Sequence, residues 1–242
     1  MTLVLSLFPG IGLLDRAFEE EGFCVVRGPD LLWGGDIRRF HPPAGKFDGV
    51  IGGPPCQAFS SLARLNKHLG ASMKFGNLIP QFERVVGEAA PDWWLMENVV
   101  GAPIPEVVQY GAWTTILDDV AVGGVTRRRR RITRGLYRGT PTPLPIKLVA
   151  LQQVYAGERA VTGNDRVLTT GARIRSRQRG GGCLPGSGTL TPLAEMLRRQ
   201  GLPADFFEHT PFTEHGKRQM LGNGVPMAMG LAIAKAVKKA TP

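Results

Sequence analysis

The sequence has few cysteines and no long hydrophobic run, and each shortage excludes a class of protein. Its three cysteines, Cys24, Cys56 and Cys183, are an odd number without paired spacing, which indicates neither a disulfide framework nor a zinc cluster. No apolar stretch reaches the roughly 20 residues that a membrane span requires. No basic segment or small-residue cleavage site accompanies the first apolar run. We therefore expect no metal, no membrane association, no secretory signal, and a monomer in the cytoplasm of a bacterium or a phage-infected host.

Positive charge is in excess and is concentrated in two segments. The formal net charge is +10, which favours a polyanionic partner. Residues 127–131 are all arginine, and residues 173–179 alternate arginine with other residues, so that an extended chain would carry these guanidinium groups on one face. A solvated basic strand or a nuclear-localisation-like tract is the competing interpretation. Three glycines at 180–182 instead favour a loop that follows a phosphate backbone.

Strands and helices alternate along the first hundred residues. Apolar runs predict strands at 2–8, 23–27, 47–51 and 93–96, and helical periodicity predicts helices at 13–21, 78–87 and 225–239, with Thr191 and Pro192 starting another. This alternation indicates an α/β fold with a parallel sheet, whose ligands bind at the carboxyl ends of the strands. We expect one domain formed by 1–138 and 189–242. The Pro-, Gly- and Arg-rich stretch 139–188 predicts a small, irregular lobe.

Cys56 follows a strand on a turn that contains two prolines. A buried structural thiol is the usual interpretation of a free cysteine, but a core position needs neither the prolines nor the amide of Gln57 beside it. Glu97 ends the strand at 93–96 and would share that edge of the sheet with Cys56, within reach of a common substrate. The alternatives are that Glu97 belongs to a polar turn and that Arg131, the last of the arginine run, faces water.

The segment 8–12, Phe-Pro-Gly-Ile-Gly, allows a backbone to approach a ligand closely at the start of a helix. It lacks the third glycine of the dinucleotide fingerprint, so a plain tight turn explains it equally well. Asp30, at the end of the second strand, is placed to accept hydrogen bonds from ribose hydroxyls. Asp36 could bond an exocyclic adenine amine while Ile37 packs on the ring. Together these residues predict a nucleoside pocket.

These motifs, in this order, resemble those of the C5-cytosine DNA methyltransferases. The resemblance covers Phe8-x-Gly10-x-Gly12, Asp30, Asp36, residues 55–60 (Pro-Cys-Gln-Ala-Phe-Ser), Leu78, Glu97-Asn98-Val99, Arg129-x-Arg131 and residues 221–226 (Leu-Gly-Asn-Gly-Val-Pro). It implies a Rossmann-like, S-adenosylmethionine-dependent methyltransferase fold, with a mostly parallel sheet, helices on both faces and a target-recognition lobe at 139–188. The implied partner is double-stranded DNA.

The resemblance also implies a reaction on a cytosine flipped out of the duplex. Cys56 would attack C6, while Glu97, protonated or sharing a proton, bonds N3 and N4, and Arg131, with Arg129 nearby, holds O2. C5 would then accept the methyl group, and loss of its proton would release the cysteine. The cofactor contacts implied are Phe8, Gly10, Ile11, Gly12, Leu13, Asp30, Asp36, Ile37, Pro54, Leu78, Asn223 and Val225. The expected nucleic-acid contacts are Gln57, Ser60, Arg173, Arg175, Arg177 and Arg179, with 61–77 as a loop that closes over DNA.

The chain departs from the family pattern in several places. Ser6 stands where the family usually has an acidic residue, Leu13 where it often has a third glycine, and Arg127 where it normally has glutamine. Only five residues separate Asp30 from Asp36, which predicts that the helix between the second and third strands is missing. These differences indicate a minimal, phage-like version of the fold.

Three other functions compete with DNA methylation. An RNA-directed relative, acting for example on tRNA, would use the same core, because basic patches do not distinguish DNA from RNA. A DNA-binding protein with a retired active site would have no need for Cys56, Glu97, Arg131 and Asn223 together. A nicotinamide oxidoreductase would depend on the glycine loop alone and leave the cysteine turn unexplained, so it ranks last.

Overall fold

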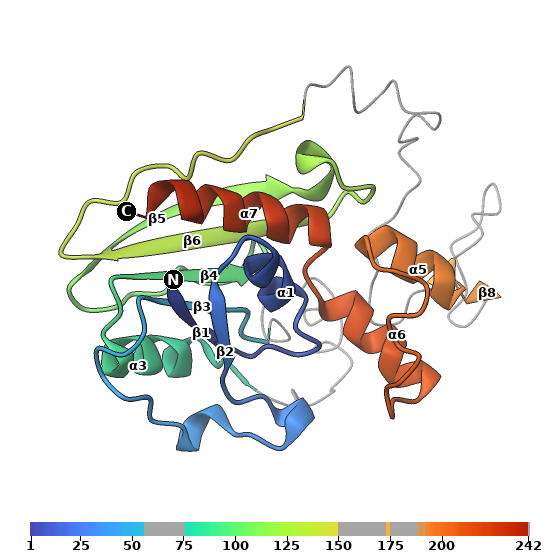
Figure 1. Cartoon of the computed structure of the whole chain (residues 1–242), viewed down its shortest axis with the longest axis horizontal. Helices are drawn as coiled ribbons and strands as arrows, with labels where there is room; N and C mark the ends of the chain where they lie inside the picture. Colours follow the sequence, from blue (N-terminus) through green and yellow to red (C-terminus); the bar gives the residue numbers. More distant parts are fainter. Residues whose placement is uncertain (56–75, 150–172, 175–188, 191, 242) are drawn as a thin grey trace.

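The core of the protein is a six-stranded sheet with strand order β2-β1-β3-β4-β6-β5 (Figure 1). The computed structural model describes residues 1–55, 76–149, 173–174, 189–190 and 192–241. The strands of the main sheet are β1 Leu3–Leu7, β2 Cys24–Arg27, β3 Gly49–Gly52, β4 Trp93–Asn98, β5 Tyr110–Asp118 and β6 Arg129–Tyr137. The strands β2, β1, β3 and β4 are parallel, and β6 is antiparallel to both β4 and β5. The predicted mostly parallel sheet is confirmed, with an antiparallel hairpin added at one edge.

Helices cover both faces of this sheet, as predicted. The helices α1 Leu13–Glu20 and α7 Met227–Ala240 pack on one face, and α3 Ile79–Ala89 packs on the other (Figure 1). The alternation along β4 shows how the strand serves both cores. Trp93 and Leu95 are buried in the apolar cluster under α1 and α7, whereas Trp94 and Met96 are buried in the cluster under α3. A strand buried on both faces is accordingly an unbroken apolar run.

The two adjacent tryptophans of β4 fit because each lies opposite a glycine on a neighbouring strand. Trp93 pairs with Gly49 of β3, and Trp94 pairs with Gly135 of β6. A Cβ at Gly49 would lie 2.2 Å from the Trp93 ring, and one at Gly135 would lie 2.1 Å from the Trp94 ring. The indole rings therefore occupy the space that side chains at these positions would fill.

The chain between β2 and β3 forms two 3-10 turns, η1 Leu31–Trp33 and η2 Ile37–Arg39. They occupy the place of the helix that the spacing of Asp30 and Asp36 predicted to be absent. Each turn begins with an aspartate that accepts a backbone hydrogen bond. Asp30 Oδ1 accepts from Leu32 N at 2.8 Å, and Asp36 Oδ1 accepts from Arg38 N at 3.0 Å. Both carboxylates thus act as N-caps of short turns.

The C-terminal region contributes α5 Leu193–Gln200 and α6 Glu214–Asn223, which pack with α1 in a third apolar cluster. The predicted start of α5 was displaced by one residue, because Pro192 occupies the N-cap position; Thr191 lies outside the described residues. The final helix begins at Met227 rather than at Val225. Neither α6 nor the hairpin β5–β6 was expected from the sequence.

A small antiparallel pair, β7 Arg173–Ile174 and β8 Thr189–Leu190, lies within and just after the predicted lobe. The first residues of that stretch contact the main domain, because Leu144 is 6% exposed in the cluster under α7 and Val149 N donates to Ala121 O. The division into 1–138 with 189–242 and 139–188 stays a prediction.

Among the described residues, no single helix has the length and apolar character needed to cross a membrane. The pair α6 and α7, bent by 41° at the break between them, meets that criterion by length and composition only.

Candidate active site

The carboxyl ends of the four parallel strands gather the predicted site residues at one edge of the sheet. The glycine loop 8–12 follows β1, Asp30 follows β2, Pro54 follows β3, and Glu97 is the penultimate residue of β4. Several predicted residues lie outside the described part of the chain: Cys56, Gln57, Ser60, Arg175, Arg177, Arg179 and most of the loop 61–77. Arg173 is described only as a backbone position of β7.

The glycine loop is held to the η1 turn by two hydrogen bonds. Phe8, Gly10 and Gly12 have φ angles of 57°, 56° and 75°, so three alternate residues adopt the left-handed conformation. Gly10 N donates to Asp30 Oδ2 at 2.9 Å, and Trp33 Nε1 donates to Gly10 O at 2.8 Å. Each Asp30 oxygen accepts one backbone N–H and retains a lone pair for a ligand. Among the described residues other than its chain neighbours, no atom lies within 4 Å of the position that a Cβ at Gly10 would take, so this side of the loop is open.

The C-terminal motif 221–226 meets the glycine loop from the other end of the chain. A Cβ at Gly224 would lie 2.6 Å from Cδ1 of Leu13, and Ile11 packs against the same apolar cluster as Leu13. Val225 is 7% exposed in the cluster under α7. Asn223, the last residue of α6, is therefore the chain neighbour of a residue that contacts Leu13, which directly follows the glycine loop.

Arg128, which sequence reasoning did not single out, holds this C-terminal motif in place. Its side chain is 2% exposed, and its guanidinium donates to Gly222 O at 2.9 Å and to Asn223 O at 3.1 Å. The Gln200 side chain donates to Leu221 O. Carbonyl groups at the end of a helix lack hydrogen-bond donors within the helix. The side chains of Arg128 and Gln200 supply such donors to the last carbonyl groups of α6.

The η2 turn presents a polar and an apolar residue together. Asp36 is hydrogen-bonded by Arg38 N, and this bond holds the pKa of its carboxyl below the usual value. Ile37 is 3% exposed and packs in the cluster under α3 with Leu78 and the half-buried Phe8. The structure thus brings these three predicted adenine and wall residues into one apolar patch.

Arg84 of α3 fixes the position of the η2 turn. Its Nη2 atom donates to Ile37 O at 2.7 Å and to Phe40 O at 3.1 Å, and its Nη1 atom donates to Glu88 Oε1 at 2.7 Å. One guanidinium therefore bridges the helix and two carbonyl groups of the turn. The motif pattern contains no signal for Arg84, because its role depends on a contact between residues more than forty positions apart.

The turn that leads to Cys56 lies against the end of β4. Asn98 Nδ2 donates to Pro54 O at 3.2 Å, and a Cβ at Gly53 would lie 3.2 Å from Glu97 Oε2. Pro54 itself is buried. The predicted carboxylate and the predicted nucleophile turn are therefore neighbours.

The arginine that faces Glu97 is Arg130. Its Nε atom lies 2.8 Å from Glu97 Oε1, with side-chain exposures of 14% and 10%, respectively. The distance is that of an ion pair, and no hydrogen bond to Oε1 is formed from any residue that the structure describes. Sequence reasoning selected Arg129 and Arg131 instead; Arg129 is exposed.

Strand alternation explains this arrangement. Glu97 pairs with Ile132, which is buried under α7, and Arg130 shares that face because it is two residues away. Arg131 pairs with Asn98 on the opposite face and donates to Ala102 O. The structure therefore does not bring Arg131 to the Glu97 carboxylate.

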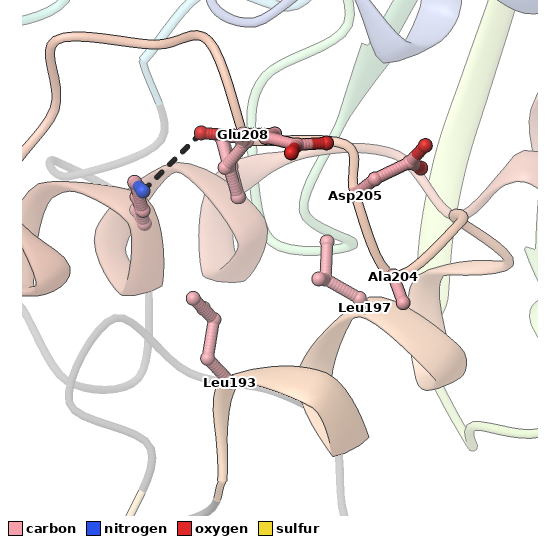
Figure 2. Close-up of a pocket in the computed structure, with 7 residues that line it drawn as sticks. Leu193, Leu197, Ala204, Asp205 and Glu208 are labelled. Carbon is pink, nitrogen blue, oxygen red and sulfur yellow. Dashed lines mark hydrogen bonds between the residues drawn. The ribbon is translucent and has the colours of Figure 1, made fainter.

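A cavity of about 450 Å³ lies elsewhere, between α5, α6 and the connecting loop (Figure 2). Leu193 and Leu197 line it from α5, and Asp205 and Glu208 line it from the loop. Lys217 of α6 donates to Phe207 O at 3.3 Å. The cavity shares no residue with the predicted site. No cluster of three or more potential metal ligands occurs in the described ranges.

Comparison with known proteins identifies the family. Residues 34–105 match the C-5 cytosine-specific DNA methylase family. The type II methyltransferase M.HgiGI of Herpetosiphon aurantiacus is 30% identical over 126 residues, a match that covers 43% of this chain and 96% of that protein. The chain belongs to the C-5 cytosine-specific DNA methylase family. The resemblance in the motifs is thereby confirmed.

Other members of the C-5 cytosine-specific DNA methylase family are longer. The type II methyltransferase M.NgoPII of Neisseria gonorrhoeae is 32% identical over 116 residues, which cover 40% of this chain and 33% of that protein. The matched part of the chain thus spans about a third of this relative's length. A mutant of Spodoptera frugiperda DNMT2 superposes with a TM-score of 0.65 at 14% identity, covering 98% of this chain and 99% of the other. This likeness confirms the Rossmann-like methyltransferase fold.

Proposed function

We propose that the protein transfers a methyl group from S-adenosylmethionine to C5 of a flipped-out cytosine in duplex DNA, through a covalent bond between Cys56 and C6. Membership in the family supports cytosine as the target. The sheet edge described above supports the site, because it collects the cofactor loop, the nucleophile turn and Glu97. The observation that carries the proposal is the contact between the turn at 53–54 and the end of β4.

This contact restricts where the nucleophile can act. Gly53 lies so close to Glu97 Oε2 that a side chain at position 53 would press on the carboxylate. The hydrogen bond from Asn98 to Pro54 O holds the next residue of the turn. Covalent geometry limits the separation of the Cα atoms of residues 54 and 56 to about 7 Å. One pyrimidine ring can then be shared by the thiol and the carboxyl group.

The ring must be activated before the thiol attacks it. Glu97, protonated or sharing a proton when the cytosine is bound, would donate to N3 and accept from the exocyclic N4, which stabilises the negative charge that develops on the ring. A guanidinium at O2 would act in the same way. The family pattern assigned this role to Arg131, but Arg130 is the arginine beside Glu97. We assign the role to Arg130, and the effects of replacing Arg130 and Arg131 are to be compared.

The residues of the glycine loop fit a nucleoside cofactor. S-adenosylmethionine, when bound, supplies a methyl group made electrophilic by a sulfonium. Asp30 would accept from the ribose hydroxyls with the lone pairs that its two backbone hydrogen bonds leave open. Asp36 and Ile37 would receive the adenine, with Phe8 and Leu78 in the same apolar patch. Pro54, Leu13, Asn223 and Val225 would complete the walls.

Trapping with 5-fluorocytosine tests the nucleophile directly. Duplex DNA from the target site, carrying 5-fluorocytosine, should form a denaturation-resistant adduct with the wild-type protein in the presence of S-adenosylmethionine, because fluorine cannot leave as the C5 proton does. The adduct should disappear in Cys56→Ser. The matched control is Cys24→Ser, which replaces a half-buried thiol of β2 and should react normally. An adduct that persists in Cys56→Ser would exclude the proposed nucleophile.

The same assay separates the alternative functions. Methylation of tRNA in place of duplex DNA would indicate the RNA-directed relative. DNA binding without an adduct and without methyl transfer would indicate a retired enzyme. The target site itself comes from bisulfite sequencing of DNA from cells that express the protein.

A further inference from the structure

A hydroxyl, a carboxylate and a guanidinium join β1, α1 and β2 directly behind the glycine loop. Ser6 Oγ donates to Asp15 Oδ1 at 2.5 Å, and Asp15 Oδ2 lies 3.1 Å from Arg27 Nε. Ser6 and Asp15 are each 1% exposed, whereas the Arg27 side chain is 55% exposed. None of these residues belongs to the predicted site. The sequence comparison noted only that Ser6 stands where the family usually has an acidic residue.

The guanidinium of Arg27 also contacts the loop. A Cβ at Gly12 would lie 2.9 Å from Arg27 Nη2, so the guanidinium packs on the backbone of Gly12. Gly12 is the last left-handed residue of the loop and the N-cap of α1. Arg27 is thus placed to restrain the point at which the loop becomes a helix.

Fold stability alone does not account for a carboxylate at this position. Burial raises the pKa of Asp15, while the hydrogen bond from Ser6 and the charge of Arg27 act in the opposite direction. Charged groups are costly to bury, and apolar residues of similar size often stabilise a core as well or better. We therefore infer that the role of the Asp15 carboxylate is to position the Arg27 guanidinium.

We propose that Asp15 is a positioning residue of the cofactor loop, which fixes the Gly12 backbone through Arg27. The inference rests on the proposed function, because the ligand of this loop is the proposed S-adenosylmethionine. The strand register supplies a test. Ser6 and Arg27 are direct partners in the parallel ladder between β1 and β2, so a carboxylate at position 6 would also reach Arg27.

The experiment exchanges the hydroxyl of Ser6 and the carboxylate of Asp15 between their two positions. Binding of S-adenosylhomocysteine is measured by calorimetry for the wild type, Asp15→Ser, Asp15→Asn and the exchange variant Ser6→Asp/Asp15→Ser. We expect both single variants to bind about tenfold more weakly, which corresponds to about 1.4 kcal/mol, and the exchange variant to recover most of the affinity. In turnover assays the KM for S-adenosylmethionine should rise while kcat at saturation changes little.

Two further variants separate positioning from folding. Arg27→Gln alters a half-exposed side chain and should lose affinity as Asp15→Asn does. Arg16→Gln removes an exposed pair with Glu20 on α1 and should leave affinity unchanged. Affinity in Asp15→Asn and Arg27→Gln equal to that of the wild type would overturn the inference, as would an exchange variant no tighter than Asp15→Ser. Failure of the wild type itself to bind S-adenosylhomocysteine would instead overturn the proposed cofactor, and this inference with it.

Discussion

The Nε atom of Arg130 lies 2.8 Å from Oε1 of Glu97, across the antiparallel pair β6 and β4. Both side chains are mostly buried, so their interaction is weakly screened by solvent. This ion pair indicates which member of the arginine run belongs to the proposed catalytic centre.

Arg130→Ala should slow the formation of the covalent adduct by about 100-fold to 1,000-fold, because it removes the charge beside Glu97 at the point where the ring becomes negative. Among the described residues the Arg131 side chain donates to Ala102 O, away from Glu97, so Arg131→Ala should slow the step by less than about tenfold. Single-turnover rates with 5-fluorocytosine DNA measure both. A larger loss in Arg131→Ala would return the role to Arg131.

Arg84→Ala should weaken cofactor binding without a comparable effect on DNA binding. The variant leaves Ile37 O and Phe40 O without their guanidinium partner, so the η2 turn can move away from the proposed adenine position. We expect an increase of about tenfold in the KM for S-adenosylmethionine, with partial rescue in Arg84→Lys. Arg16→Ala is the surface control. An equal rise in the KM for DNA would show a general loss of structure instead.

Gly49→Ala should destabilise the protein by about 1–3 kcal/mol or more, because the new methyl group would overlap the Trp93 ring. Gly87→Ala is the matched control, since a Cβ at this position of α3 would have no described atom beyond its own stretch of helix within 4 Å. That variant should be more stable by about 0.5–1 kcal/mol, because alanine is the better helix former. Urea unfolding measures both. Equal stabilities would mean that the sheet adjusts freely around Trp93.

Glu195 should make stability depend on pH in the acid range. Hydrogen bonds from Arg198 and Arg199 lower the pKa of this glutamate to about 2, from a usual value of 4.5. The folded state therefore binds fewer protons than the unfolded state in this range, so the contribution of Glu195 is complete above about pH 4.5 and is lost as the pH falls toward 2.

The difference in unfolding free energy between the wild type and Glu195→Gln should accordingly shrink between pH 5 and the acid limit of reversible unfolding. Arg198→Ala, which removes the main partner, should show a smaller pH dependence in the same range. A difference that stays constant with pH would contradict the assignment.

The sequence alone predicted the features that depend on residues close together in the chain. The apolar runs gave the positions of β1 to β4, the periodicity gave α1 and α3, and the short spacing between Asp30 and Asp36 gave the missing helix. The order of the motifs identified the family. It also predicted the edge of the sheet at which the site lies, since parallel strands have their carboxyl ends on the same side.

Only the tertiary structure decided which side chains meet. Five adjacent arginines are equivalent by composition, and it is the pairing of β6 with β4 that turns Arg130 toward Glu97 and Arg131 away from it. The contacts of Asp15 with Arg27 and of Arg84 with the η2 turn likewise join different elements. Strand register is set by burial against distant parts of the chain, and a shift of one residue would exchange the two faces. No local pattern contains that information.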